Sequence, residues 1–165
     1  MSDPVWRPMR RADLPAVKAI SDAVHGAYTE DMAVYAERLA LYPDGCKVLE
    51  RDGSLLGYLI AHPWRSDAPP ALGSLLGAIP SSADIYYLHD LALLPDARGS
   101  GAGASGTTAA IAQAQAAGYA RMMLMAVAGA DSFWARQGFT RLPGRIASYG
   151  EEACLMERRV QAGVA

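Results

Sequence analysis

The part of this sequence with the clearest chemical meaning is a glycine-rich segment that follows an apolar stretch and precedes a long run of small residues. It reads Asp90-Leu-Ala-Leu-Leu-Pro-Asp-Ala-Arg-Gly-Ser-Gly-Ala-Gly-Ala104. A turn of this kind directs several backbone N–H groups toward one point before a helix, where a phosphate or pyrophosphate can bind. Glycine lets the main chain approach the anion and adopt positive φ. The sequence therefore predicts a phosphorylated cofactor on Arg98, Gly99, Ser100, Gly101, Ala102, Gly103 and Ala104.

Two cofactor patterns overlap in this segment. The first, Gly101-Ala-Gly-Ala-Ser-Gly106, matches the G-x-G-x-x-G fingerprint of dinucleotide-binding proteins. That fold also needs an Asp or Glu about 20 residues further on, at the end of its second strand, to bind the ribose. The corresponding residues 121–127 contain no acid. A nucleotide-dependent oxidoreductase is therefore disfavoured.

The second pattern is Arg98-x-x-Gly101-x-Gly103, which resembles the loop that binds the pyrophosphate of acetyl-CoA in GNAT-type N-acetyltransferases. Val5-Trp-Arg-Pro-Met-Arg-Arg-Ala-Asp-Leu14 is similar to that family's first strand and turn. Asp131-Ser-Phe-Trp-Ala-Arg-Gln-Gly-Phe139 is similar to its late FYxxxGF helix. The resemblance spans nearly the whole chain. It implies acetyl-CoA as co-substrate, a small-molecule or peptide amine as acceptor, and an α/β fold with a mixed, mostly antiparallel, twisted sheet and helices on both faces.

Acetyl transfer from a thioester to an amine needs a proton acceptor, donors for the oxyanion and a proton for the leaving thiolate. The resemblance places backbone donors at Leu91, Ala92 and Leu93. The candidate bases are His89 and Asp90, and because neighbours on a strand point to opposite faces, only one is expected to line the cleft. His89, with an unperturbed pKa of about 6.5, suits a base at neutral pH, whereas Asp90 needs a raised pKa or a relaying water. The alternative is that both side chains are structural.

Trp134 departs from the family pattern. It stands where many members carry a Tyr that protonates the CoA thiolate, and an indole N–H is not a usable acid. Either another group replaces that Tyr, and Tyr149 is the nearest candidate, or the thiolate takes its proton from water. The alternative for Tyr149 is a packing aromatic. Trp134 itself is expected to pack over the cofactor arm or the core. The Asn that the family often uses to hold pantetheine is also missing from residues 126–130. Because of these departures, the alternative interpretation is a non-catalytic CoA-binding module.

Further polar residues could shape the acceptor site or bind the 3′-phosphate of CoA. The family builds its acceptor pocket near the end of the first helix, which here carries His25, Tyr28 and Glu30. A long segment rich in Pro, Gly and Ser begins at His62, Trp64 and Arg65 and is a candidate functional loop. The candidates for the 3′-phosphate are Arg136, Arg141 and Arg145.

The elements that position these residues follow from periodicity and turn signals. Strands are expected at residues 5–10, 46–51, 55–62, 85–94, 121–127 and near 154–158, and helices at 14–24, 32–40 and 103–117. Asp52-Gly53 predicts a two-residue hairpin. Because no charged residue occurs from Gly99 to Ala120, the third helix is expected to be largely buried. Strands that flank isolated helices imply a mixed α/β sheet.

Composition narrows the class of protein. The 165 residues suit a single domain, 1–165, and 52% hydrophobic with 19% charged residues indicate a folded globule. A net charge of −2 gives no argument for binding nucleic acid or a membrane surface. The N-terminus lacks an apolar signal core, so a cytoplasmic location is expected. Two cysteines, Cys46 and Cys154, are too few for a disulfide framework or a zinc site, and no metal is expected. The sequence leaves open whether the protein forms a homodimer.

Overall fold

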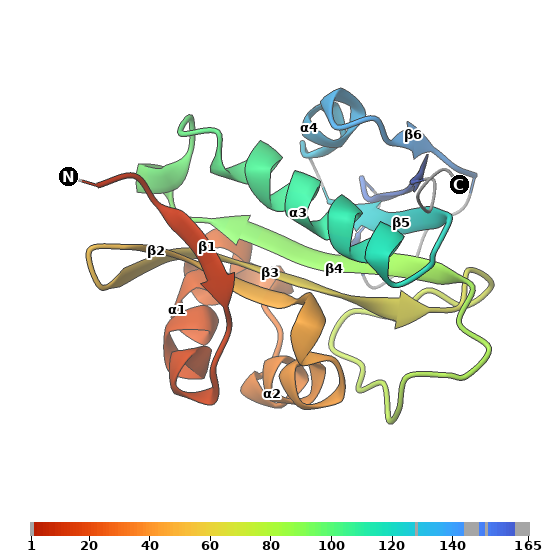
Figure 1. Cartoon of the computed structure of the whole chain (residues 1–165), viewed down its shortest axis with the longest axis horizontal. Helices are drawn as coiled ribbons and strands as arrows, with labels where there is room; N and C mark the ends of the chain where they lie inside the picture. The colour runs from red at the N-terminus through yellow and green to blue at the C-terminus, as the bar shows by residue number, and fades with distance from the viewer. Residues whose placement is uncertain (1, 128, 144–148, 151, 161–165) are drawn as a thin grey trace.

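The protein is built on one seven-stranded sheet, seen here in a computed structural model that describes residues 2–127, 129–143, 149–150 and 152–160. The strand order is β1-β2-β3-β4-β5-β7-β6 (Figure 1). The strands are β1 (Val5–Pro8), β2 (Cys46–Arg51), β3 (Ser54–Trp64), β4 (Ile85–Leu93), β5 (Arg121–Ala126), β6 (Thr140–Arg141) and β7 (Cys154–Arg159). Among the described strands β4 and β5 pair in parallel, and the other neighbours are antiparallel. The expected mixed, mostly antiparallel sheet is confirmed.

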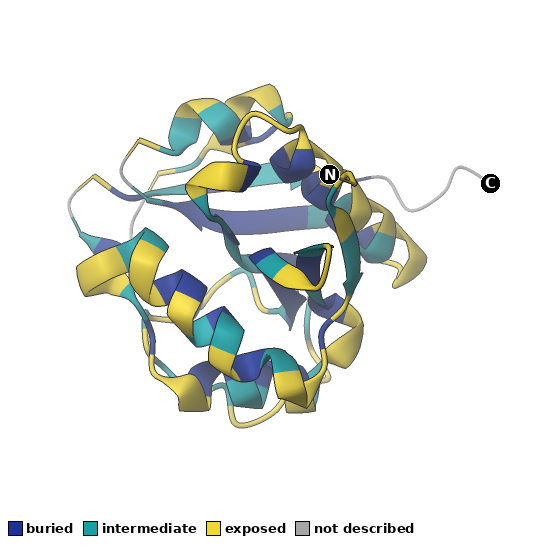
Figure 2. Cartoon of the chain, turned by 90° about the vertical axis from the view of Figure 1, so that its left-hand side faces the viewer, coloured by how far each residue is buried: buried dark blue, intermediate teal, exposed yellow. Residues whose placement is uncertain are grey.

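Helices cover both faces of the sheet, as expected. The helices α1 (Leu14–His25) and α2 (Met32–Leu41) lie on one face, and α3 (Ala102–Ala116) and α4 (Asp131–Arg136) lie on the other (Figure 1). Side chains alternate between the two layers along β3: Tyr58 and Ile60 pack with α1 and α2, while Leu59 packs with the α3 layer. The sheet is accordingly buried, and the helices are exposed along their outer sides (Figure 2). No helix in the described residues has both the length and the apolarity to cross a membrane.

The prediction that α3 is largely buried is wrong. Its buried residues are Ala102, Gly103, Gly106, Thr107, Ala110 and Ala114, and most of the others are exposed. Small uncharged residues occupy both faces, so composition did not mark the buried one. The inner side of α3 does lie close to the sheet, because a Cβ on Gly106 would lie 2.8 Å from the Trp6 ring. The Trp6 indole N–H also donates to the Ala102 carbonyl at 3.0 Å.

The predicted hairpin is confirmed, and the long loop after it is held in place by side chains of α2. Asp52 and Gly53 both have positive φ, and β3 extends two residues beyond the expected end. The Glu37 carboxylate accepts hydrogen bonds from the Leu76 and Gly77 amides, and Arg38 donates to the Ser74 carbonyl. These bonds fix the middle of loop 65–84 against α2.

Candidate active site

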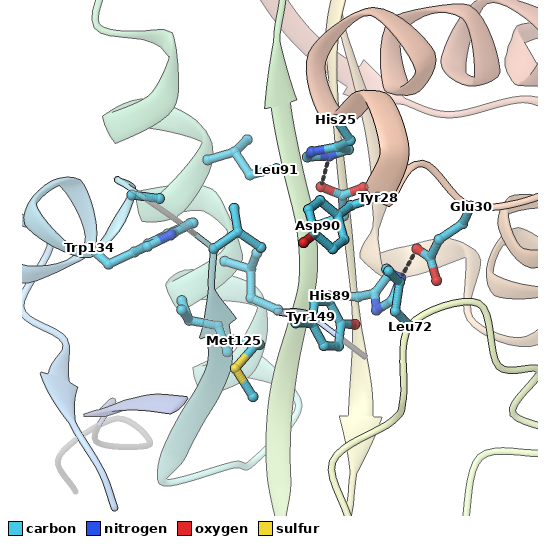
Figure 3. A pocket seen from close by; sticks show the side chains of 14 residues that line it. His25, Tyr28, Glu30, Leu72, His89, Asp90, Leu91, Met125, Trp134 and Tyr149 are labelled. Carbon is cyan, nitrogen blue, oxygen red and sulfur yellow. Dashed lines mark hydrogen bonds and ion pairs between the residues drawn. The ribbon is translucent and has the colours of Figure 1, made fainter. Parts of the chain in front are cut away.

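The sheet opens between the parallel strands β4 and β5. The two strands pair at Tyr86 with Met122 and at Tyr87 with Met123, and their pairing ends there. Beyond this point a pocket lies between the diverging strands, with walls from α1, β4, β5, α4 and the loops (Figure 3). Its lining residues are His25, Tyr28, Glu30, Leu72, Leu88, His89, Asp90, Leu91, Leu124, Met125, Val127, Ala130, Trp134 and Tyr149.

Some backbone amides of β4 face this opening. The Leu94 amide donates to the Leu56 carbonyl at 2.8 Å, so it points toward β3. Because N–H directions alternate along an antiparallel strand, the Ala92 amide also points toward β3, so the expected backbone donor at Ala92 does not face the opening. The amides of Leu91 and Leu93 do point toward the opening. The Arg98 guanidinium donates to the Leu93 carbonyl at 3.3 Å, which agrees with that direction.

The glycine loop directly follows the open end of β4. Gly99 and Gly101 have φ of 80° and 84°, and α3 begins at Ala102. Within the described residues the amides of Gly99, Gly101, Gly103 and Ala104 donate to no protein acceptor. Free amides at a helix N-terminus, on a loop bent by positive φ, fit an anion such as pyrophosphate. Gly103 also meets a packing need, because a Cβ there would lie 3.1 Å from the Phe133 ring.

A β-bulge places both candidate bases in the pocket, contrary to the expectation that only one would line it. Ile60 pairs with Asp90 and Ala61 with Leu88, so His89 is an extra residue on β4. The bulge cancels the alternation of side chains between faces at this point. Both His89 and Asp90 therefore line the pocket (Figure 3). Asp90 contacts His25 at the end of α1, and His89 contacts Glu30, which follows α1 in the chain.

Asp90 is held between two partners. Its Oδ1 lies 2.9 Å from Nε2 of His25, and its Oδ2 accepts a hydrogen bond of 2.5 Å from the Tyr58 hydroxyl. Burial is the largest single influence and would raise the pKa of the Asp90 carboxyl, but His25, the charge of His89 and the Tyr58 hydrogen bond together outweigh burial and lower that pKa. Burial likewise lowers the pKa of His25, but Asp90 outweighs it and raises that pKa. The raised pKa that Asp90 would need as a base is therefore not found.

His89 forms a second pair, with Glu30. Its Nε2 lies 2.6 Å from Oε1 of Glu30, and the Gly73 amide of the long loop donates to Oε2 at 2.7 Å. The side chains of His89 and Glu30 are only 1% and 3% exposed. Burial is the largest single influence and raises the pKa of Glu30, but the hydrogen bond and charge of His89 and the hydrogen bond from the Gly73 amide together outweigh it and lower that pKa. The carboxylate of Glu30 is therefore ionised at neutral pH. The His89 Nδ1 atom is buried without a partner among the described residues.

Trp134 and Tyr149 lie on opposite sides of the pocket (Figure 3). Trp134 is buried and packs edge-on against Phe133 and Phe139, in agreement with the expected packing role. The Tyr149 hydroxyl is buried without a partner in the described part of the chain, and burial raises its pKa, so it stays protonated at neutral pH.

Other predicted residues lie apart from the pocket lining or are engaged elsewhere. His62 is buried behind the pocket, where burial lowers its pKa to about 3, so it is neutral. Trp64 donates to the Ala68 carbonyl, and Arg65 pairs with Asp67. Arg141 pairs with Asp131 on the surface, and Arg136 is exposed at the end of α4. Arg145 lies outside the described residues.

Besides the bulge at His89 and the pairing of His25 with Asp90, sequence reasoning missed two features of the site. Tyr58, which donates to Asp90, comes from the middle of β3 and carries no motif. The pairing of Glu30 with His89 joins residues 59 positions apart. The only feature of the sequence that could have pointed to Tyr58 was a polar residue within an apolar strand. Nothing in the sequence predicted how β3 and β4 align, so the contact of Tyr58 with Asp90 could not be foreseen.

Comparisons with known proteins agree with this geometry. The model of the acetyltransferase (GNAT) family matches residues 14–139. A search of curated protein sequences gives no significant match.

Among solved structures, the GphF GNAT-like decarboxylase in complex with isobutyryl-CoA superposes with a TM-score of 0.81 at 18% identity, covering 95% of this chain and 100% of that one. The loading GNATL domain of CurA from Lyngbya majuscula gives 0.83 at 13% identity, covering 96% and 98%. The ribosomal-protein-S18-alanine N-acetyltransferase from Escherichia coli gives 0.69 at 17% identity, covering 98% and 96%. At these identities the structures show a shared fold.

Proposed function

Because the chain belongs to the acetyltransferase (GNAT) family, we propose that it transfers the acetyl group of acetyl-CoA to a primary amine of a small molecule or a protein. The observation that carries this proposal is the opening between β4 and β5. It joins a loop of free amides at one end to two carboxylate–histidine pairs beside the pocket. The proton acceptors, the free amides of β4 and the glycine loop then follow one another along residues 89–104.

The proposed roles of the backbone follow from where its donors point. The loop of residues 98–104 would hold the pyrophosphate, with Arg98 as the nearby cation. The amides of Leu91 and Leu93 would bind the pantetheine arm and the thioester carbonyl in the opening. The Ala92 amide points toward β3, so Ala92 would stabilise this stretch of β4 through the packing of its buried side chain. Donors fixed before the reaction stabilise a developing oxyanion at little reorganisation cost.

The acceptor would enter from the outer hollow beside the pocket. This hollow is lined by Val24, His25, Tyr28, Val127, Tyr149, Gly150 and Glu152. The lowered pKa values of Glu30 and Asp90 keep both carboxylates ionised at neutral pH, and Glu152 adds a third acid. Glu152 in the outer hollow and the two carboxylates deeper in the pocket favour an ammonium over an anionic acceptor. Proton acceptors among the pocket residues then prepare the amine for attack, and His89 is one candidate.

The leaving thiolate would take its proton from Tyr149 or from water. Trp134 has no acidic proton near neutral pH, and its ring is occupied in packing. Tyr149 lines the pocket with a protonated hydroxyl that has no partner among the described residues. Its position supports the proposed donor role.

A second candidate is decarboxylation of an acyl-CoA that carries a β-carboxylate, since one structural relative is a GNAT-like decarboxylase. The observation that favours it is the burial of His89 and Glu30. A proton donor shielded from solvent suits protonation of a carbanion formed beside the thioester. A third candidate is a CoA-binding module without activity, suggested by Trp134.

One assay separates these candidates. The purified protein is incubated with acetyl-CoA and a panel of primary amines and peptides with free N-termini, and free CoA thiol is followed. Thiol release that depends on an amine supports acetyl transfer. In a parallel arm without amine, conversion of malonyl-CoA to acetyl-CoA with release of CO₂ indicates decarboxylation instead. Binding of acetyl-CoA with no turnover in either arm indicates a binding module and contradicts the proposed transfer.

A further inference from the structure

Resting on the proposed transfer, we propose that His25 at the end of α1 takes the proton of the acceptor amine, and that Asp90 and Tyr58 act as its positioning residues. Sequence reasoning placed His25 only in the acceptor pocket and assigned the base to His89 or Asp90. Contacts, exposure and charge in the pocket each point to His25.

Asp90 is poorly suited to accept the proton itself. Both of its oxygens are engaged, one with His25 and one with the Tyr58 hydroxyl. Its side chain is 10% exposed, and its partners lower its pKa. A carboxylate in this state is a weak base that is well placed to orient an imidazole, because it accepts hydrogen bonds from both sides.

The hydrogen bond to Asp90 fixes which nitrogen of His25 is free. An ionised carboxylate only accepts hydrogen bonds, so Nε2 of His25 must carry the hydrogen. In the neutral ring Nδ1 then has the lone pair, and no described residue donates to it. An imidazole held by a carboxylate at one nitrogen, with the other nitrogen free, is arranged as a general base.

The position of His25 matches the path of an incoming amine better than that of His89. Its side chain is 18% exposed and lines both the inner pocket and the outer hollow. His89 is 1% exposed, lines only the inner pocket and has a buried Nδ1. In Figure 3, His25 lies next to Asp90 of β4 and beside Tyr28. An amine that enters through the outer hollow therefore meets His25 first.

The charges around His25 favour its protonated form. Asp90 faces it from β4, Glu30 follows α1, and Glu152, Tyr28 and Tyr149 share the outer hollow or the pocket with it. His89, which is paired with Glu30, is the other titratable imidazole of the pocket. His25 is also the last residue of α1, where the helix dipole favours a cation. Burial opposes these effects, and the net result is a raised pKa for His25.

An acceptor that enters as an ammonium first loses one proton to solvent through the outer hollow. In the proposed step the neutral amine nitrogen then bonds to the thioester carbonyl carbon while one N–H proton passes to Nδ1 of neutral His25. The C–S bond breaks, which gives an amide and a CoA thiolate. The thiolate takes a proton from Tyr149 or from solvent. His25 then releases its proton to solvent through the outer hollow. If Tyr149 protonated the thiolate, it takes a proton back from solvent. Atoms and charge balance with acetyl-CoA and the amine alone.

The test compares His25→Gln with His89→Gln, using acetyl-CoA and the best acceptor found in the amine panel. His25→Gln should lower turnover by about 10²–10⁴-fold, the usual contribution of a positioned base, with little change in acetyl-CoA affinity. His89→Gln should lower it less. Ala23→Gln introduces the same side chain at an exposed position of α1 and should match the wild type. A well-folded His25→Gln with wild-type turnover overturns the assignment while transfer itself stands. Wild-type protein that transfers to no amine overturns the proposed function instead.

Two further readouts separate catalysis from structure. Added imidazole should restore part of the turnover of His25→Ala, since this side chain opens to the outer hollow, and no rescue counts against the role. In ¹⁵N NMR of the protein without ligands, neutral His25 should carry its hydrogen on Nε2. Hydrogen on Nδ1 instead would overturn the assignment, whatever the acceptor is.

Discussion

The Nε2 atom of His25 lies 2.9 Å from Oδ1 of Asp90, although 65 positions separate the two residues in the chain. The contact joins the last turn of α1 to the bulge of β4. It explains why Asp90 keeps a lowered pKa and why His25 has a raised one. Two predictions follow from this pair alone.

The first concerns Asp90→Asn. An amide donates as well as accepts, so it can stabilise the ring of His25 with its hydrogen on Nδ1, which blocks the free nitrogen. Loss of the negative charge also lowers the pKa of His25. Turnover should fall by about 10²–10⁴-fold, and the acid limb of the remaining activity should move to lower pH. A pH–rate profile, taken with an acceptor whose own amine pKa is far below that of imidazole, measures both effects. An unmoved acid limb would contradict this account.

The second concerns stability against pH. The raised pKa of His25 means that its pairing stabilises the fold below the ordinary value of 6.5 and that this contribution is lost as pH rises through the folded-state pKa. The lowered pKa of Asp90 means that its contribution is present above 3.8 and is lost as pH falls through the folded-state pKa. Thermal unfolding of wild type and His25→Gln should therefore differ most between about pH 4 and 6.5. An equal difference at alkaline pH would show that the ion pair adds nothing.

Local patterns in the sequence predicted the parts of the site that depend on neighbouring residues. The loop from Arg98 to Gly103 is one example, because its glycines and the following helix lie together in the chain. The bulge at His89 was not predicted, since it arises from how β4 pairs with β3. The same holds for Tyr58, which meets Asp90 through strand register. The exposed side of α3 was missed for a different reason: small uncharged residues on both faces leave no amphipathic signal.

The third prediction tests the anion site without disturbing its glycines. Ala104→Asp places a carboxylate in the first turn of α3, where the helix dipole tolerates it, and where it would repel a bound pyrophosphate. Gly101 is unsuitable for this test because its φ is 84°, and Gly103 because of its contact with Phe133. Acetyl-CoA binding, measured by calorimetry, should fall by at least about tenfold, which corresponds to about 1.4 kcal/mol.

The matched control for that experiment is Ala112→Asp. Ala112 is also exposed on α3, but it lies eight residues further along the helix and away from the loop. It should bind acetyl-CoA as the wild type does. If both variants bind equally well, the loop is not the pyrophosphate site.

The fourth prediction concerns Trp134. Because the ring packs against Phe133 and Phe139, Trp134→Phe should keep most of the activity and leave the alkaline limb of the pH profile unchanged. Trp134→Ala should lower the free energy of unfolding by about 3–5 kcal/mol, as expected for truncation of a buried Trp. Denaturant unfolding and steady-state rates measure the two effects. Loss of activity in a well-folded Trp134→Phe would mean that the indole N–H is a required donor.

The central claim is that the acetyl group moves from CoA to an amine, and the product tests it most directly. The protein is given acetyl-CoA labelled with ¹³C at the carbonyl, together with the acceptor that releases most CoA thiol. Mass spectrometry and ¹³C NMR should then find one labelled amide carbonyl on the acceptor for each CoA thiol released. Thiol release with the label in free acetate, or no label on any amine, would contradict the claim.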